Sequence, residues 1–339
     1  MPDFAKRLEA IERVRLANLP TPLDEAPRLA AHAGLARLLV KRDDTTGLAL
    51  GGNKARKLEY ELATLARGGC DVIVTIGGTQ SNHAAMTAAA ARRLGVDVKL
   101  VLGGPDFERF TGNLLLDVLY GAEIRYLVDD DANDALAAAM DEWVLELRRA
   151  GRRPLALPIG GSTGLGALGY VRATRELAAQ LGEGPVQIVT AVGSCGTLAG
   201  LIVGARLFLP RARVVGVSAS RASGAIAART VEIARECAEI LGADLAVGAG
   251  DVEAHDAYAG EYGVPTPAGL EAIHAAARLE GLLLDPCYTG KAMSGLFDLA
   301  RRGVLDAAIP TVFLHTGGAP IAFSDESLFA SQAICTKVR

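Results

Sequence analysis

The sequence predicts an α/β protein built from two open, twisted, mostly parallel sheets with helices on both faces. Three observations support this fold class. Short apolar runs alternate with helix-like segments along the 339 residues, glycine-rich polar turns follow many of the apolar runs, and no low-complexity linker interrupts the pattern. A chain of this length can bury the cores of two domains.

Apolar runs in the first half are expected to be buried strands, with helices between them. The expected strands cover residues 37–41, 72–76, 98–102, 123–128 and 154–158. The expected helices cover residues 54–68, 82–94, 111–120 and 132–150. Because strand and helix alternate, we expect parallel strands joined by crossover helices.

The second half repeats this pattern. Its expected strands cover residues 186–192, 213–217 and 311–314, and its expected helices end near residue 207 or cover 223–241, 267–279 and 289–302. Residues 250–265 have no clear periodicity. The glycine pair Gly160-Gly161 is a candidate junction between domains. It divides the chain into a large domain of residues 1–48 and 162–339 and a small domain of residues 49–161.

Composition points to a small-molecule partner. The net charge is −4, and acidic and basic residues are mixed, so no basic surface for nucleic acid or membrane lipid stands out. No apolar run is long enough to span a membrane, and the first residues lack the apolar core of a signal peptide. The five cysteines and five histidines lack the spacing of metal ligands. We therefore expect a cytoplasmic protein without a metal.

The run Gly51-Gly52-Asn53-Lys54 places a lysine at the start of an expected helix. The positive end of a helix lowers the pKa of an amine, which favours the free base needed to form an imine. Only seven lysines occur in the chain, so few other residues could supply a primary amine. The simpler interpretation is an ordinary helix start with Asn53 as its cap.

Two polar turns each follow a strand and open a helix. In Gly77–His83, the helix N-terminus could hold a carboxylate or a phosphate, or Ser81 or Asn82 could merely cap the helix. In Gly193–Thr197, small residues expose backbone N–H groups that could form an anion-binding nest. The second turn lacks both the lysine of a P-loop and the spacing of a dinucleotide fingerprint.

Two further segments place hydroxyl groups after apolar runs. They are Asp285–Lys291, which contains Tyr288 and Thr289, and His315–Gly318, which contains Thr316. A tyrosine in a loop is most often half-buried packing, so Tyr288 alone does not indicate catalysis. Because ligands of open α/β sheets bind at the carboxyl ends of strands, all these turns could converge on one cleft.

Taken together and in this order, the motifs resemble the β-family of enzymes dependent on pyridoxal 5′-phosphate (PLP), which have the tryptophan-synthase-β-like fold. Within it they resemble the branch of D-cysteine desulfhydrase, 1-aminocyclopropane-1-carboxylate (ACC) deaminase and L-cysteate sulfo-lyase. The resemblance extends from Leu19–Leu23 and Val40–Asp44 to His315–Pro320. It implies PLP in the cleft between a large and a small domain, an amino-acid substrate and a homodimer.

The resemblance also implies a role for each matched position, with Lys54 as the Schiff-base lysine. The other implied cofactor-binding residues are Asn53, Asn82, Gly193, Ser194, Cys195, Gly196, Thr197, Thr289 and Thr316. The implied substrate-binding residues are Ser81, Asn82, His83, Gly161 and Tyr288. Ser81, Tyr262 and Tyr288 are implied to act in catalysis beside Lys54.

The choice within the branch depends on two positions. ACC deaminases carry glutamine where this chain has His83, and an acidic residue where it has Thr289. Both positions here resemble D-cysteine desulfhydrase, which implies β-elimination of D-cysteine to pyruvate, ammonia and sulfide. L-cysteate sulfo-lyase is the alternative, and ACC deaminase or a non-catalytic ligand-binding relative is less favoured. Ala85-Met86 stand where the family often has Arg-Gln, which would leave fewer polar groups near the cleft.

Overall fold

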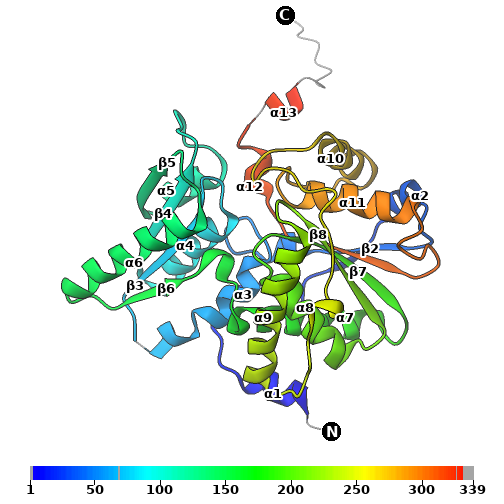
Figure 1. The fold of residues 1–339 in the computed structure, drawn as a ribbon, viewed down its shortest axis with the longest axis horizontal. Coiled ribbons are helices and arrows are strands. Elements are labelled where there is room, and N and C mark those ends of the chain that lie inside the picture. The colour runs from blue at the N-terminus through cyan, green and yellow to red at the C-terminus, as the bar shows by residue number, and fades with distance from the viewer. Residues whose placement is uncertain (1–2, 68, 326, 331–339) are drawn as a thin grey trace, which may run out of the picture.

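The computed structural model describes residues 3–67, 69–325 and 327–330, and it contains two sheets (Figure 1). The larger sheet has the strand order β1 (Leu23–Glu25), β2 (Leu38–Lys41), β10 (Thr311–Leu314), β7 (Val186–Val192), β8 (Ala212–Ser218) and β9 (Glu253–His255). All its neighbouring strands are parallel except β1, which pairs antiparallel with β2.

The smaller sheet has the order β5 (Glu123–Val128), β4 (Asp97–Gly104), β3 (Val72–Gly78) and β6 (Pro154–Leu157), all parallel. Every residue of β3 and of β7 is buried, as expected for central strands covered on both faces. The predicted fold class is therefore confirmed.

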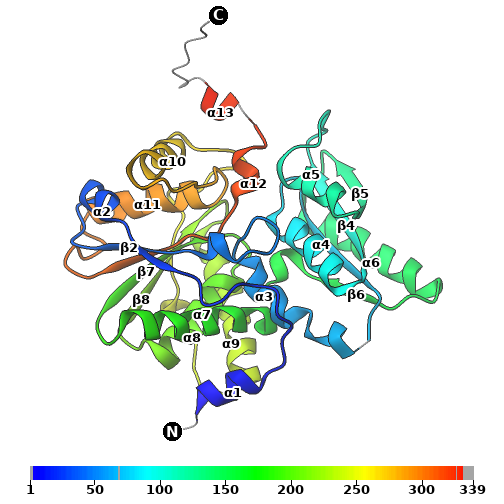
Figure 2. The same ribbon diagram turned by 180° about the vertical axis from the view of Figure 1, so that it is seen from behind.

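Helices cover both faces of each sheet (Figures 1 and 2). The smaller sheet is flanked by α4 (Asn82–Leu94), α5 (Gly112–Leu119) and α6 (Asn133–Arg149). The larger sheet has α2 (Pro27–Ala33), α10 (Pro267–Glu280) and α11 (Thr289–Arg301) on one face, and α7 (Gly164–Leu181), α8 (Gly196–Phe208) and α9 (Ser223–Leu241) on the other. The remaining helices are α1 (Phe4–Ala10), α3 (Lys54–Glu61), α12 (Ala319–Ala322) and α13 (Ser327–Ala330).

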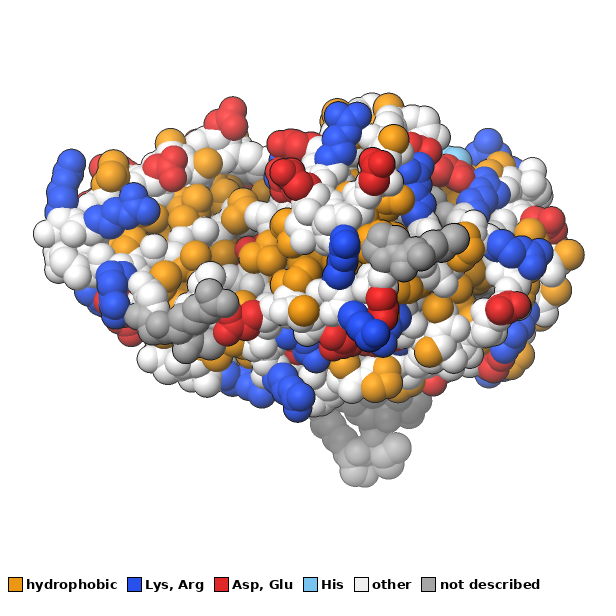
Figure 3. All heavy atoms as spheres, turned by 90° about the horizontal axis from the view of Figure 1, so that it is seen from below, with side chains coloured by type: hydrophobic (Ala, Val, Ile, Leu, Met, Phe, Trp, Pro, Cys, Tyr) orange, Lys and Arg blue, Asp and Glu red, His pale blue; other side chains and the backbone are white. Residues whose placement is uncertain are grey.

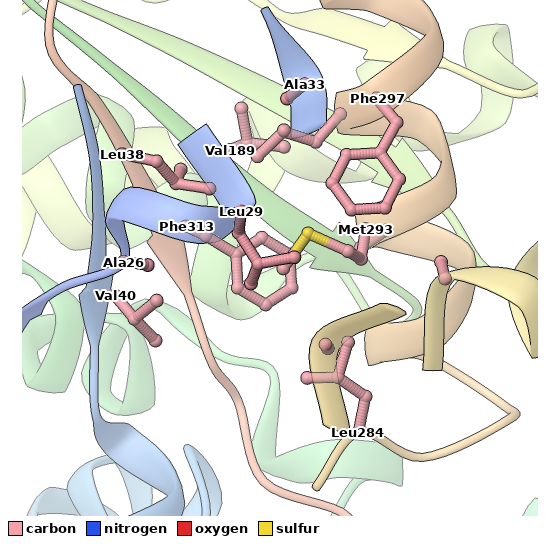
Figure 4. Close-up of a cluster of buried hydrophobic side chains, with 14 of the residues drawn as sticks. Ala26, Leu29, Ala33, Leu38, Val40, Val189, Leu284, Met293, Phe297 and Phe313 are labelled. Atoms are coloured by element: carbon pink, nitrogen blue, oxygen red, sulfur yellow. The ribbon is translucent and has the colours of Figure 1, made fainter. Parts of the chain in front are cut away.

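The core beneath α2, α10 and α11 is made of aliphatic and aromatic side chains, with Phe313 of β10 near its centre (Figure 4). Leu29 of α2 and Met293 of α11 are fully buried in the same cluster. Truncating such a side chain to alanine costs about 2–5 kcal/mol, because a cavity adds to the lost burial. This layer therefore supports β7 and β10 from one face of the sheet. The cavity described below opens at the carboxyl ends of these strands.

Helix α7 is the main element that sequence patterns do not predict. Its first turns contain Gly164, Gly166 and Gly169, which lower helix propensity. The fold needs at least one of them, because a Cβ on Gly169 would lie 2.4 Å from the carbonyl oxygen of Arg56 in α3. Likewise, a Cβ on Gly200 of α8 would lie 2.2 Å from the carbonyl oxygen of Ala167. Glycine here permits close contact between α3, α7 and α8.

Two other expectations are corrected. The helix expected over 54–68 ends at Glu61, and residues Ala63–Arg67 form a 3₁₀ turn, since the glycines that follow do not support a longer helix. The segment 250–265, expected to be irregular, contributes the short edge strand β9.

A buried ionic network fixes α3 from behind. Arg56 Nε donates to Asp43 Oδ2 at 2.8 Å, and both side chains have no exposed surface. Arg56 also pairs with Glu176 of α7 at 2.9 Å, while Tyr170 donates its hydroxyl proton to Asp43 at 2.6 Å. Burial alone would raise the pKa of Asp43, but the adjacent Arg56 guanidinium holds it below its ordinary value. Asp43 is therefore a buried carboxylate that accepts hydrogen bonds from both Arg56 and Tyr170.

On the face shown in Figure 3, acidic and basic side chains are interspersed, with apolar ones between them. Within the described part of the chain, no helix is long and apolar enough to cross a membrane. The same residues contain no group of three or more histidine, cysteine or acidic side chains that could hold a metal ion.

Candidate active site

A cavity of about 310 Å³ lies between the two sheets, at the carboxyl ends of β3, β7 and β8. Its size is within the range of small-ligand sites, and its position is the one expected for an open α/β sheet. It brings together most of the predicted site residues: Asn53, Lys54, Ser81, Asn82, His83, Gly193, Ser194, Cys195, Thr197, Tyr262, Tyr288 and Thr316. Gly161, Gly196 and Thr289 are not among the lining residues.

Lys54 is the first residue of α3, and the preceding loop fixes its position. A Cβ on Gly51 would lie 1.8 Å from the carbonyl oxygen of Asp44, so only glycine fits there. Asn53 does not cap the helix with its side chain. Instead its Nδ2 donates to Thr197 Oγ1 at 3.0 Å, and its backbone N–H donates to the carbonyl oxygen of Thr316. Asn53 therefore stands at the N-cap position of α3, as the simpler interpretation expects, but its side chain forms no capping hydrogen bond.

Burial in the cavity wall lowers the pKa of Lys54 to about 8. The direction is the one predicted, but its main cause is loss of solvation rather than the positive helix end. An amine with this pKa is a substantial fraction of free base near neutral pH, which is the form that attacks a carbonyl.

The rate at which pyridoxal attaches to the cofactor-free protein tests this pKa. Below pH 8 the fraction of free amine rises about tenfold with each pH unit, and above it the fraction levels off. The rate, followed by absorbance in stopped flow, is expected to show the same bend. A rate that keeps rising toward the ordinary lysine pKa of 10.5 would contradict the lowered value.

The turn between β3 and α4 presents donors to the cavity. Ser81 caps α4, accepting a hydrogen bond from Ala84 N at 3.2 Å, so the capping interpretation of Ser81 holds. The first backbone N–H groups of the helix remain available to an anion. Asn82 Oδ1 accepts from Asn113 Nδ2 at 2.7 Å, which leaves the amide N–H groups of Asn82 as donors. The turn can hold a carboxylate.

His83 enters the cavity as a neutral ring. The Thr75 hydroxyl donates to the carbonyl oxygen of Leu157 at 2.9 Å, so His83 Nε2, 3.0 Å from the same hydroxyl, must be the donor of that pair. Burial, followed by the charges of Lys54 and Lys57, lowers the pKa of His83 well below 6.5. Its buried Nδ1 has no partner and carries a lone pair. His83 can therefore assist a carboxylate only through its backbone N–H.

The turn after β7 has the form of an anion nest. Cys195 adopts a left-handed backbone conformation with φ 70°, and α8 begins at the next residue. Gly196 N donates to the carbonyl oxygen of Ser194 at 3.0 Å, so the other N–H groups at this helix end are the ones that could bind an anion. Thr197 Oγ1 accepts from Asn53, which leaves its own proton free for an anion. The thiol of Cys195 is buried, and burial raises its pKa, so it adds no negative charge.

Ser220 and Arg221 also line the cavity, and sequence patterns do not predict them. The available signal is their position, because they follow β8 as the nest follows the adjacent β7. The Ser218 hydroxyl accepts from Arg221 N and donates to Arg221 O, which fixes the backbone of this turn. Arg221 therefore brings a positive charge to the wall that contains the nest.

Two tyrosines face each other across the cavity mouth. Tyr288 donates its hydroxyl proton to the Tyr262 hydroxyl at 2.9 Å, and the ring centroids lie 6.1 Å apart. A Cβ on Gly78 would lie 2.8 Å from the Tyr262 ring, and one on Gly193 would lie 3.0 Å from the Tyr288 ring. Glycines at the ends of β3 and β7 thus make room for both rings. Burial raises the pKa of both hydroxyls, which keeps them protonated.

Thr289 and Asp285 form a closed unit behind Tyr288. Thr289 Oγ1 donates to Asp285 Oδ2 at 2.6 Å and accepts from Asp285 N at 2.7 Å, so its only proton is used within this loop. Asp285 accepts three backbone N–H groups, from Cys287, Tyr288 and Thr289, which positions Tyr288. Thr316, and not Thr289, is among the residues that line the cavity. A cofactor contact of Thr289 stays a prediction.

Ala85 and Met86 are buried in α4, and neither lines the cavity. Met86 packs in the core of the smaller sheet. The apolar residues at these positions therefore remove no donor or acceptor from the cavity wall.

The site fits a ligand that carries both an aldehyde and a phosphate. Lys54 supplies an amine of lowered pKa, the turn Gly193–Thr197 supplies the nest, and a hydroxyl of Thr316 can face a ring nitrogen. The turn Ser81–His83 lies in the same cavity and can hold the carboxylate of an amino acid. These are the groups that PLP and an amino-acid substrate require.

Comparisons with known proteins agree with this assignment. The family model described as "Pyridoxal-phosphate dependent enzyme" matches residues 14–317. The chain is 41% identical over 317 residues to a putative ACC deaminase of Pyrococcus horikoshii, covering 94% of this chain and 95% of the relative. It is also 41% identical over 327 residues to a D-cysteine desulfhydrase of Klebsiella pneumoniae, covering 94% and 98%.

Solved structures give the same result. A crystal structure described as an ACC deaminase homologue has a TM-score of 0.89 and 39% identity, covering 97% of this chain and 99% of that one. A fungal L-serine ammonia-lyase from Rhizomucor miehei, at 20% identity and a TM-score of 0.67, shares the fold. The chain belongs to the family of pyridoxal-phosphate dependent enzymes, in which it is a PLP-dependent lyase.

Proposed function

We propose that the enzyme catalyses β-elimination from a small sulfur-containing amino acid, with D-cysteine as the preferred substrate. With one water, D-cysteine gives pyruvate, ammonia and hydrogen sulfide. The observation that supports this proposal is the polarity around Thr316. The lining residue Thr316 carries a hydroxyl, whereas Asp285 is not among the lining residues and its carboxyl is saturated by donors of its own loop.

This polarity matters because PLP, when bound, supplies an electron sink for the carbanion at Cα. A carboxylate beside the ring nitrogen would keep that nitrogen protonated and make the sink strong. A hydroxyl leaves the nitrogen unprotonated, which suits a substrate whose β-substituent leaves easily. Thiols meet this condition, and ring opening of ACC does not.

The residues of the cavity divide the remaining work. The helix end at Ser81–His83 holds the substrate carboxylate and so fixes the direction of the Cα–H bond. Lys54 Nζ removes the α-proton and holds it. The hydroxyls of Tyr262 and Tyr288, both protonated, lie at the cavity mouth and can donate to the departing sulfur. A thiolate needs this help less than an alkoxide does, because it leaves more readily.

L-cysteate, which would release sulfite, is the competing substrate. A sulfonate has three acceptor oxygens and needs several donors in the side-chain pocket. The lining includes the apolar residues Leu136 and Ile159, and the cationic Arg221 lies on the wall that contains the nest. This arrangement favours a thiol over a sulfonate.

The test is a product screen of the PLP-loaded enzyme with D-cysteine, L-cysteine, L-cysteate, β-chloro-D-alanine and D-serine. We expect the fastest pyruvate release from D-cysteine and β-chloro-D-alanine and slow release from D-serine, because hydroxide leaves poorly. ACC serves as the control and is expected to give no 2-oxobutanoate. Rapid 2-oxobutanoate formation would indicate ACC deaminase activity, and sulfite release that exceeds sulfide release would indicate L-cysteate sulfo-lyase activity. Either result would contradict the proposal.

A further inference from the structure

A second lysine lies one turn after Lys54 on α3, and none of the roles above uses it. Lys57 is 1% exposed, and its Nζ donates to the carbonyl oxygen of Gly160 at 2.5 Å and to Ser162 Oγ at 2.7 Å. It does not line the cavity. An ammonium group is rarely buried this deeply without a function or an ion pair, and the Gly160 carbonyl and the Ser162 hydroxyl that it contacts are both neutral.

The hydrogen bonds of Lys57 lead directly to the nest. Ser162 Oγ lies 2.7 Å from Ser194 Oγ, and Ser194 lines the cavity. Ser162 Oγ accepts from Lys57 Nζ and directs its own proton to Ser194 Oγ, which is closer, at 2.7 Å, than the carbonyl oxygen of Gly160, at 3.5 Å. One lone pair of the Ser194 hydroxyl then accepts from Ser162, and its only proton is free to point at an anion in the nest.

Two glycines make this chain sterically possible. A Cβ on Gly196, the first residue of α8, would lie 2.7 Å from Lys57 Nζ and 2.8 Å from Ser162 Oγ. A Cβ on Gly160 would lie 2.2 Å from Ser194 Oγ. The amine therefore sits directly beneath the N-terminus of α8, in a space that any other residue at position 196 would fill.

The charges around Lys57 are unbalanced without an anion. Burial has the largest effect, and it lowers the pKa of Lys57 well below 10.5. The charges of Lys54 and Arg229 lower this pKa further, whereas Glu61 and the thiol of Cys195 oppose the shift. The Glu61 carboxyl does not balance these positive charges, because burial raises its own pKa and so favours its neutral form. The positive end of α8 adds to the imbalance. A phosphate dianion in the nest would correct it.

We propose that Lys57 is a positioning residue for the cofactor phosphate, which it serves from behind the nest through Ser162 and Ser194. It orients the Ser194 hydroxyl toward the phosphate and supplies a positive charge that never enters the cavity. The role concerns the phosphate only, and it is independent of which amino acid the enzyme takes.

The test compares PLP with pyridoxal, which has the same aldehyde but no phosphate. Dissociation constants of both are measured on the cofactor-free forms of Lys57→Met and Ser162→Ala, without any substrate. Loss of a charged hydrogen bond should weaken PLP binding by about tenfold to a hundredfold in Lys57→Met, and Ser162→Ala should show a smaller loss in the same direction. Pyridoxal attachment should change by less than about twofold, because it makes no use of the nest.

Lys99→Met is the matched control, since Lys99 pairs with Glu123 at the edge of the smaller sheet. It should leave the affinities for both ligands unchanged. The ³¹P resonance of bound PLP is the second readout, and it should shift in Ser162→Ala, which removes one hydroxyl and preserves the fold. Equal weakening of PLP and pyridoxal, or an unchanged PLP affinity and ³¹P resonance in Ser162→Ala, would overturn the proposal. None of these outcomes depends on D-cysteine, so the substrate assignment is tested separately.

Discussion

Lys54→Ala is expected to abolish covalent attachment of the cofactor and to lower the rate of elimination by a factor on the order of 10³ to 10⁶, the range seen when an essential base or nucleophile is removed. Lys54 is the only lysine among the residues that line the cavity in the described structure. Its neighbour Lys57 is buried behind the nest and cannot replace it.

Two measurements check this result. The visible absorbance of attached cofactor should disappear in Lys54→Ala, and borohydride reduction should add no cofactor mass to the protein. Lys99→Met, which also removes one lysine, should retain both signals. A Lys54→Ala protein that kept the absorbance band would show that another amine holds the cofactor.

The second large effect is expected from Asp43→Ala, which should lower the free energy of unfolding by about 3–5 kcal/mol. The substitution leaves the Arg56 guanidinium buried beside only one acidic partner, Glu176, and it also removes the acceptor of Tyr170 and of Thr21. Urea denaturation of the PLP-loaded protein measures the change.

Glu25→Ala is the comparison for this prediction. Glu25 pairs with Arg37, and both side chains are about half exposed, so its loss should cost less than about 1 kcal/mol. Similar losses for the two variants would mean that the buried network contributes little. Because the pKa of Asp43 is lowered in the folded protein, its stabilisation is present above its ordinary pKa of 3.8 and is lost as the pH falls below that value.

Much of the fold follows from local patterns. The strands at 123–128, 186–192 and 311–314 and the helices at 82–94 and 223–241 have the predicted bounds, because each combines a strong apolar pattern with clear flanking turns. Helix α7 is the counterexample. Its glycines indicate a loop by propensity, and only the backbone contact with Arg56 explains why a helix needs them.

The site divides in the same way. Turns at strand ends were identifiable, since the carboxyl ends of parallel strands must meet at one edge. Hydrogen-bond direction was not, because it depends on partners distant in sequence. Thus the amide of Asn53 donates to Thr197 rather than capping the helix end. The donor role of His83 Nε2 follows from Leu157, more than seventy residues away, through the hydroxyl of Thr75.

The glycine contacts between α3, α7 and α8 have a consequence for divergence within the family. The helix that carries Lys54 and the helix that begins at the nest both approach α7 closely through glycine contacts with backbone atoms. The separation between amine and nest is then insensitive to which side chains cover the rest of the cavity. Positions such as 83, 262, 288 and 316 are therefore free to vary with the substrate, while the distance that the cofactor must span is preserved.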